Sequence, residues 1–400
     1  LSETAIEKRE ARGIAIDLLD YEVSPMYLDS VRSIGAKVIH TSRWINGATV
    51  EANDEAIRAI EKCGFVDTIY LTRMEPTEQA FDIPSISLRK RIIAEDTLPD
   101  APLPVASIEQ LDQLNLLPLH QAGYKGKGIR IGIADGGFYN ADSLAVLPQK
   151  QWLGYADFTD DEDDFFGSTG NHGTLCLTAI IAETADYQGT ATEAEYFLFR
   201  TEEHSTESPK EIDNWVAAIE MADSLGLDIV STSLGYTTFD DESFNFAYAD
   251  MDGRSSRGAQ AAIIAARKGL LLIVAAGNDG NKTWHYLSTP ADADSILTVG
   301  AVDIDRTITN FSSFGPSADG RIKPEICAVG KQTILLNPSN DEIMKGNGTC
   351  FACPLVAGMA ACLWSALPHA SNMEIRERII RSSDRYSTPH EQYGYGIHET

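Results

Sequence analysis

Residues 346–358 read Gly346-Asn-Gly-Thr-Cys350-Phe-Ala-Cys-Pro-Leu-Val-Ala-Gly358. Glycines in this stretch let the backbone turn tightly, and the apolar run over residues 351–367 predicts a buried helix. Pro354 suits the first turn of that helix, where no N–H partner is lost. Cys350 is therefore expected at a helix N-terminus, where N–H groups without an intrahelical acceptor and the helix dipole favour negative charge, on a thiolate or a developing oxyanion.

Length and charge limit the classes of protein that the chain can belong to. Four hundred residues exceed most single-core domains, which predicts one large catalytic domain and a smaller one. The net charge of -27, from 32 basic and 59 acidic residues, argues against nucleic acid or an anionic membrane surface as the main partner. No apolar run of 18 residues free of charges or helix breakers stands out, so no transmembrane segment is expected. The first residues lack a hydrophobic signal region, as they also would after removal of a signal peptide.

The six cysteines do not form the framework of a disulfide-rich fold in a chain of this length. Cys350 and Cys353 have C-x-x-C spacing, which leaves a redox or zinc pair as an alternative interpretation. We favour Cys353 as a small apolar residue that packs inside the predicted helix.

Residues 1–73 alternate strand-like and helix-like patterns, which predicts a small ferredoxin-like α/β domain of β-α-β-β-α-β order. The expected elements are 13–17, 25–33, 37–40, 48–50, 54–63 and 66–70. In residues 74–106 the periodicity fades and prolines cluster after Arg89-Lys-Arg91. This segment is expected to be an exposed linker that holds a processing site.

Residues 107–400 predict a doubly wound, mostly parallel α/β sheet. Short apolar runs rich in β-branched residues are typical of strands that are buried on both faces. The expected strands are 129–134, 196–199, 228–230, 270–275 and 296–299, with helices at 212–225 and 256–269 between them. Functional groups of such sheets gather beyond the carboxyl ends of the strands.

Polar motifs do follow these strands. Asp135 ends the first strand, where a carboxylate can orient a histidine, and His172 opens an apolar, helix-like segment. Asn278 ends the strand-like run 270–275 in Ala275-Ala-Gly-Asn-Asp-Gly280. Taken singly, these are an ordinary turn aspartate, a capping or core histidine and a turn asparagine. In the order Asp135, His172, Asn278 and Cys350 they resemble the active-site motifs of the subtilisin-like serine proteases, or subtilases.

The resemblance covers about residues 107–400 and implies a role for each motif. Asp135 would orient His172, His172 would act as the general base, and residue 350 would be the nucleophile. Asn278 would donate to the oxyanion. The substrate-binding residues would be Ser233, Leu234, Gly235, Ala276 and Gly277, along which an extended peptide pairs as an added strand. The first domain resembles the inhibitory propeptide of the family, which occupies the substrate cleft. The family also implies a secreted or periplasmic protein.

Cys350 departs from the family, which has a serine at this position. A thiolate beside an imidazolium is a competent nucleophile, but a site built for a hydroxyl loses transition-state fit with the larger sulfur. Poor peptide cleavage is therefore expected. Cys350 is either a natural nucleophile or a deliberate replacement of serine that keeps the precursor uncut, and we favour replacement. The helix after His172, Leu175-Cys-Leu-Thr178, also lacks the small residues common in the family.

The sequence also raises three alternatives, one for a metal site and two for the function. The run Asp157-Phe-Thr-Asp-Asp-Glu-Asp-Asp164 supplies oxygen ligands for calcium, but lacks EF-hand spacing, so a solvated loop is the preferred interpretation and no metal ligand is assigned. A catalytically silent subtilase-like protein that only binds peptides is the alternative function. A nucleotide-binding protein is disfavoured because no strand is followed by a G-x-G-x-x-G or P-loop pattern.

Overall fold

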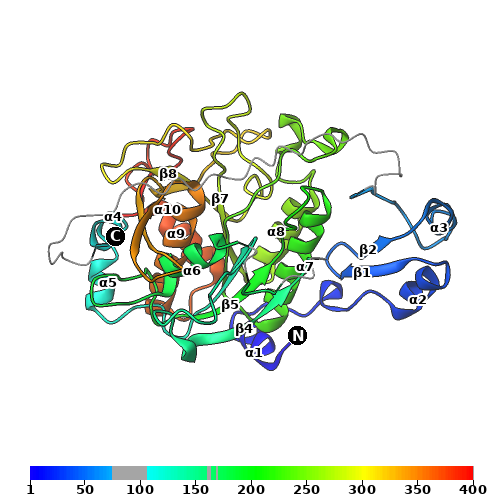
Figure 1. The fold of residues 1–400 in the computed structure, drawn as a ribbon, viewed down its shortest axis with the longest axis horizontal. Helices are drawn as coiled ribbons and strands as arrows, with labels where there is room; N and C mark the ends of the chain where they lie inside the picture. Colours follow the sequence, from blue (N-terminus) through cyan, green and yellow to red (C-terminus); the bar gives the residue numbers. More distant parts are fainter. Residues whose placement is uncertain (74–105, 160–163, 168–169, 400) are drawn as a thin grey trace.

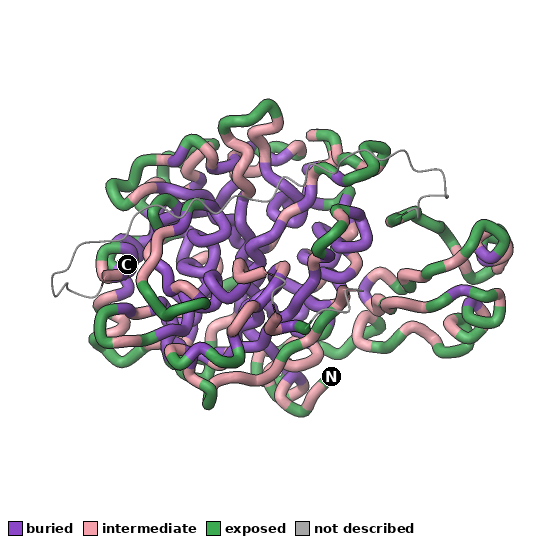
Figure 2. Tube along the Cα trace, viewed as in Figure 1, coloured by how far each residue is buried: buried purple, intermediate pink, exposed green. Residues whose placement is uncertain are grey.

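The computed structural model describes residues 1–73, 106–159, 164–167 and 170–399. Apart from residue 106, the predicted linker and processing site in 74–106 lie outside the described residues. Figure 1 shows a large α/β body with a smaller N-terminal module beside it. The buried residues concentrate in the large body (Figure 2).

A seven-stranded sheet forms the centre of the large body, in the order β4-β5-β3-β6-β7-β8-β9. All its neighbouring pairs are parallel, which confirms the predicted sheet. The strands are β3 (Arg130–Asp135), β4 (Trp152–Asp157), β5 (Glu195–Arg200), β6 (Ile229–Thr232), β7 (Leu271–Ala275), β8 (Leu297–Val302) and β9 (Ile326–Val329). From β3 the chain builds the sheet first toward β5 and β4, and then in the opposite direction from β6 to β9. The end of β3 is thus the topological switch point, where ligands of such sheets bind.

Helices cover both faces of the sheet. The apolar side chains of α6 (His172–Ile181), α9 (Thr349–Ala366) and α10 (Asn372–Arg381) belong to one core, and those of α7 (Lys210–Leu225) and α8 (Arg257–Arg267) to another. Two short helices, α4 (Ile108–Gln113) and α5 (Leu117–Gln121), precede β3. Helix α9 is long and apolar enough to cross a membrane, but 83% of that window is buried, as expected of the core helix of a globular domain.

A β-hairpin leads into α9. Strands β10 (Thr333–Leu336) and β11 (Ile343–Gly346) pair antiparallel as a separate two-stranded sheet. Short 3₁₀ turns lie at Leu18–Asp20, Gln149–Gln151, Glu242–Phe244 and Tyr248–Asp250.

The N-terminal module contains α1 (Glu3–Ala11), α2 (Pro25–Ser33), the antiparallel pair β1 (Lys37–Ser42) and β2 (Gly47–Glu51), and α3 (Asp54–Ile60). The central α-β-β-α order is as predicted. The expected strands at 13–17 and 66–70 do not form, and α1 was not expected. Asp17 instead caps a 3₁₀ turn and binds Lys268 of the large body, so residues 13–17 do not pair with β1.

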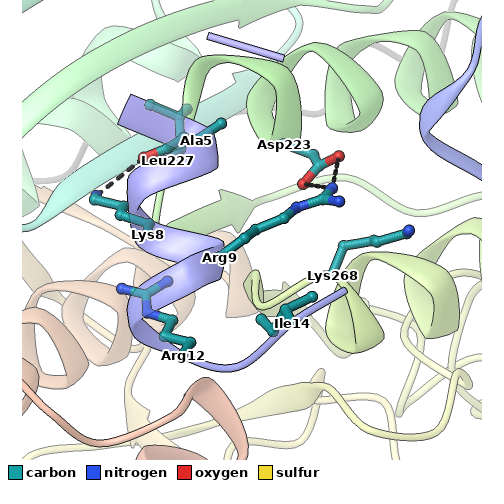
Figure 3. A pocket seen from close by; sticks show the side chains of 9 residues that line it. Ala5, Lys8, Arg9, Arg12, Ile14, Asp223, Leu227 and Lys268 are labelled. Atoms are coloured by element: carbon teal, nitrogen blue, oxygen red, sulfur yellow. Dashed lines mark hydrogen bonds and ion pairs between the residues drawn. The ribbon is translucent and has the colours of Figure 1, made fainter. Parts of the chain in front are cut away.

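Helix α1 docks on the large body where α7 ends (Figure 3). Arg9 forms two hydrogen bonds with the Asp223 carboxylate, and Lys8 and Arg12 both bind Asp228. Gly226 ends α7 with φ 73°, and a Cβ there would lie 2.8 Å from the backbone nitrogen of Ala5. Glycine therefore serves both the helix cap and the close approach of α1.

Candidate active site

Asp135 and His172 are brought together at the carboxyl end of β3. Asp135 is the last residue of β3 and His172 the first of α6. The histidine Nδ1 lies 2.8 and 3.0 Å from the two carboxylate oxygens, and the Gly136 N–H donates to Oδ1 at 2.8 Å. Gly173 allows this approach, since a Cβ there would lie 2.6 Å from the Gly137 carbonyl oxygen. The carboxylate thus holds the tautomer with its proton on Nδ1, which leaves Nε2 to act as a base.

The surroundings of His172 favour its protonated form. Burial alone would lower the pKa of the imidazole, but the Asp135 carboxylate outweighs it and the pKa of His172 is raised well above its ordinary value. Negative charge on Cys176 or Cys350 raises it further. Burial also raises the pKa of Cys176 to about 11, so at neutral pH Cys176 is an uncharged thiol. Asp135 is therefore the main charge that raises the pKa of His172.

Cys350 lies in the first turn of α9, as predicted. The preceding Gly348 has φ 151°, and a Cβ there would come within 2.6 Å of the Cys350 sulfur. Only glycine leaves room for the sulfur at this turn. Cys350 is 8% exposed, and its sulfur lies at the helix end that favours negative charge.

Asn278 faces the Cys350 sulfur. Its side-chain oxygen accepts hydrogen bonds from the Thr349 N–H at 2.8 Å and the Thr349 hydroxyl at 3.0 Å. These two donors fix the amide orientation and direct its nitrogen to Cys350, where Nδ2 and Sγ are 3.8 Å apart. An oxyanion formed on a carbonyl beside the sulfur could therefore accept from Asn278.

Cys176 links the histidine to the nucleophile position. Its sulfur lies 3.9 Å from His172 Nδ1 and 3.4 Å from the Cys350 carbonyl oxygen. The Phe351 ring also packs on the imidazole, with centroids 5.5 Å apart. His172 Nε2 is buried and has no hydrogen-bond partner among the described residues. Nε2 is therefore available to accept a proton.

The predicted substrate-binding residues flank Cys350 on two sides. Ser233, Leu234 and Gly235 follow β6, and the Ser233 hydroxyl donates to the Cys350 carbonyl oxygen at 2.8 Å. Ala276 and Gly277 follow β7, and the Gly277 carbonyl accepts from the Thr349 hydroxyl at 3.1 Å. Both segments are therefore fixed to the start of α9.

Cys353 lies one turn further along α9 and faces the sheet. Its sulfur contacts the Thr232 and Ile273 carbonyl oxygens at 3.5 and 3.2 Å, and burial raises the pKa of its thiol to about 12. This environment agrees with the packing role that we favoured, because Cys353 is an inert thiol inside the core.

Two groups of described residues place possible metal ligands within 4.8 Å of one another. One consists of Asp135, His172 and Cys176 of the candidate active site, and the other of Glu202, Glu207 and Glu211. Residues 160–163 of the acidic run 157–164 lie outside the described residues. The solvated loop preferred there stays a prediction, with calcium binding as its alternative.

Sequence reasoning did not assign roles to Cys176 and Thr349. Cys176 is four residues after His172, and residues at this spacing share one face of a helix, so helical periodicity could have placed it beside the imidazole. Thr349 could not be found in this way, because its contact with Asn278 joins residues 71 positions apart.

Comparison with known proteins finds relatives of both parts of the chain. The model of the subtilase family matches residues 126–396, and that of the Bacteroidota peptidase S8 propeptide domain matches residues 1–83. Subtilisin DY of Bacillus licheniformis is 30% identical over 281 residues, which cover 69% of this chain and 90% of the relative. Subtilisin E of Bacillus subtilis is 24% identical over 376 residues, 92% of this chain and 83% of the relative.

Solved structures agree on the fold. MycP1, a serine protease described as an essential component of the type VII (ESX-1) secretion system, superposes with a TM-score of 0.60 at 20% identity, over 78% of this chain and 91% of MycP1. The two family models and the similarity to subtilisin DY show that the chain belongs to the subtilase family and is a subtilisin-like serine protease with an N-terminal propeptide domain.

Proposed function

We propose that this chain is the precursor of an endopeptidase that cleaves peptide bonds by acyl transfer at residue 350. The observation that carries the proposal is the contact chain from Asp135 to His172 to Cys176 and Cys350, which ends at the Asn278 amide. These five residues come from four separate parts of the sequence and gather beyond the carboxyl ends of the strands, where the functional groups of such sheets are expected.

In this mechanism His172 Nε2 takes the proton of the nucleophile as it attacks the substrate carbonyl. The Asp135 carboxylate stabilises the imidazolium, and Asn278 Nδ2 with the residue-350 backbone N–H stabilises the oxyanion. The tetrahedral intermediate then collapses, and His172 gives its proton to the leaving amine. Water then attacks the carbonyl of the acyl-enzyme while His172 takes its proton. His172 returns the proton to residue 350 as the acyl group leaves.

We further propose that the cysteine chain is largely inactive. The Cys350 sulfur lies 3.8 Å from Asn278 Nδ2, and because sulfur is larger than oxygen it would displace the substrate carbonyl from a site built for a hydroxyl. A misplacement of about 1 Å can cost roughly 100-fold in rate.

The substrate is proposed to be an extended protein or peptide segment that pairs with residues 233–235. The propeptide domain is proposed to occupy the same cleft. Secretion or a periplasmic location fits the family, since a relative is named as a minor extracellular protease.

The test measures hydrolysis of a mixed peptide substrate by the chain, by Cys350→Ser and by Cys350→Ala. We expect Cys350→Ser to exceed the cysteine chain by roughly 100-fold or more, and Cys350→Ala to be inactive. A serine variant no more active than the alanine variant would overturn the proposal and favour a silent peptide-binding protein.

A further inference from the structure

The N-terminal module is attached to the protease domain at two separate places. The first is helix α7, where the Ser42 hydroxyl and the Arg43 N–H of the module donate to the Glu220 carboxylate. The second is helix α1, which docks beyond the end of α7 (Figure 3). The two attachments use different residues on both sides, so each can open while the other stays closed.

Helix α1 packs on the protease domain and not on the rest of the module. Within the described residues, the apolar core of the module includes no residue of α1; its buried members are Val31, Ala36 and Ile60. Ala5 and Arg9 of α1 are nevertheless 2% and 3% exposed. They are buried because Ala5 lies against Gly226 and Arg9 pairs with Asp223, two residues of the protease domain. Helix α1 is therefore an anchor in its own right.

Charge decides which helix this surface accepts. The buried Asp228 carboxylate binds both Lys8 and Arg12, each at 2.5 Å. These two cations are four residues apart and so share one face of α1. The Arg12 guanidinium also lies 4.6 Å from the centroid of the Trp364 ring, which adds a cation–π contact. A buried carboxylate without a cation is costly, so the surface selects a helix with basic residues one turn apart.

The docking surface lies at the edge of the sheet opposite the candidate active site. Asp228 directly precedes β6, whereas Ser233 directly follows it and contacts Cys350. The two edges are separated by the length of β6, about 13 Å. The binding of α1 therefore does not depend on what the cleft holds.

We propose that the surface formed by Asp223, Gly226, Asp228 and Trp364 is a docking site for a basic helix, and that α1 in this site keeps the module on the protease domain after the chain is cut within residues 74–106. The inference goes beyond peptide cleavage, because it concerns how long the module stays bound. Two linked attachments hold far longer than either one alone, since an opened contact re-forms before the other opens. A cut between the two domains would then leave them together, and their separation would depend on α1.

The experiment uses the cysteine chain with the recognition sequence of a site-specific protease placed within residues 74–106. After complete cutting and dilution, size-exclusion chromatography over time gives the rate at which the two fragments separate. We expect the double variant Lys8→Met, Arg12→Met to separate at least about 100-fold faster than the parent chain, the low end of the gain from a second linked contact. The matched control is Arg32→Met with Lys37→Met, which removes the same two charges from exposed ion pairs of the module and should separate like the parent.

Thermal melting of the uncut chains shows whether each variant is folded. If the double variant does not fold, Lys8→Met alone takes its place, since the Lys8 side chain is 23% exposed and Asp228 keeps Arg12. This variant should separate about tenfold faster than Lys37→Met. Equal rates in the α1 variant and its control overturn the proposal, and so does immediate separation of the parent fragments. The measurement needs no hydrolysis by residue 350, so failure of the peptidase proposal leaves it unaffected.

Discussion

Replacement of Arg9 by methionine tests whether buried charges hold the N-terminal helix on the protease domain. Arg9 is 3% exposed and pairs with Asp223 at 2.6 Å and Asp20 at 2.5 Å. Removal of one partner of a buried ion pair costs about 3–5 kcal/mol when the other charge is left uncompensated. Here Asp223 keeps Arg43 at 2.8 Å and Asp20 keeps Lys268 at 2.7 Å.

Because both carboxylates retain a cation, we expect a smaller cost of about 2–3 kcal/mol for Arg9→Met. That loss makes local opening of α1 roughly 30- to 150-fold more frequent, which amide hydrogen exchange over residues 3–11 measures directly. Arg32→Met is the matched control, since Arg32 forms an ion pair with Asp29 in which both side chains are more than half exposed. A pair of that kind contributes about 0–1 kcal/mol. Equal exchange rates in the two variants would refute the assigned role of the buried charges.

Three further changes test the site and its surroundings. Asn278→Ala in the Cys350→Ser background should lower kcat by about 100- to 1000-fold, a range established on subtilisin itself; a loss below threefold would contradict the donor role. Asp135→Asn should lower the pKa of His172, since the carboxylate is the charge that raises it; an unmoved NMR titration of labelled histidine would contradict this. Burial and two neighbouring carboxylates raise the pKa of Glu211, so the folded state binds a proton that the unfolded state releases. The free energy of unfolding should then fall as the pH rises from about 4.5 to about 10, and Glu211→Gln should flatten that fall; identical slopes in chemical denaturation would argue against it.

The parallel sheet could be predicted because its central strands are buried on both faces. Strand β7 (Leu271–Ala275) is buried at every residue, which leaves a continuous apolar run in the sequence. In edge strand β4 (Trp152–Asp157) some residues are half-buried and the others are exposed. Hairpin strand β11 (Ile343–Gly346) is only four residues long. Their sequences carry no comparable signal, so neither was expected.

Helix α1 could not be predicted because its stabilising contacts are distant in sequence. Its residues Glu3–Ala11 are mostly polar and resemble a solvated segment. Arg9 is nevertheless buried, since its partner Asp223 lies 214 residues further along the chain. Local patterns cannot distinguish a solvated arginine from one that is paired in the interior.

The residues of the candidate site could be predicted from the order of their motifs. The contacts that hold these residues in place could not be predicted. Asp135 and His172 end or begin regular elements, and such positions can be read from the change in apolar periodicity. Ser288 approaches Gly235 because the Tyr236–Thr289 bridge joins their neighbours, which are far apart in the sequence. Contacts of this kind appear only when the chain is folded.

Intact mass spectrometry of the purified Cys350→Ser variant tests most directly whether residue 350 is the nucleophile of a protease precursor. After incubation, the serine variant should release a fragment cut within residues 74–106, whereas the cysteine chain and a Cys350→Ser variant that also carries His172→Ala should keep their full mass. A serine variant that stays whole and leaves added peptides intact would contradict the account.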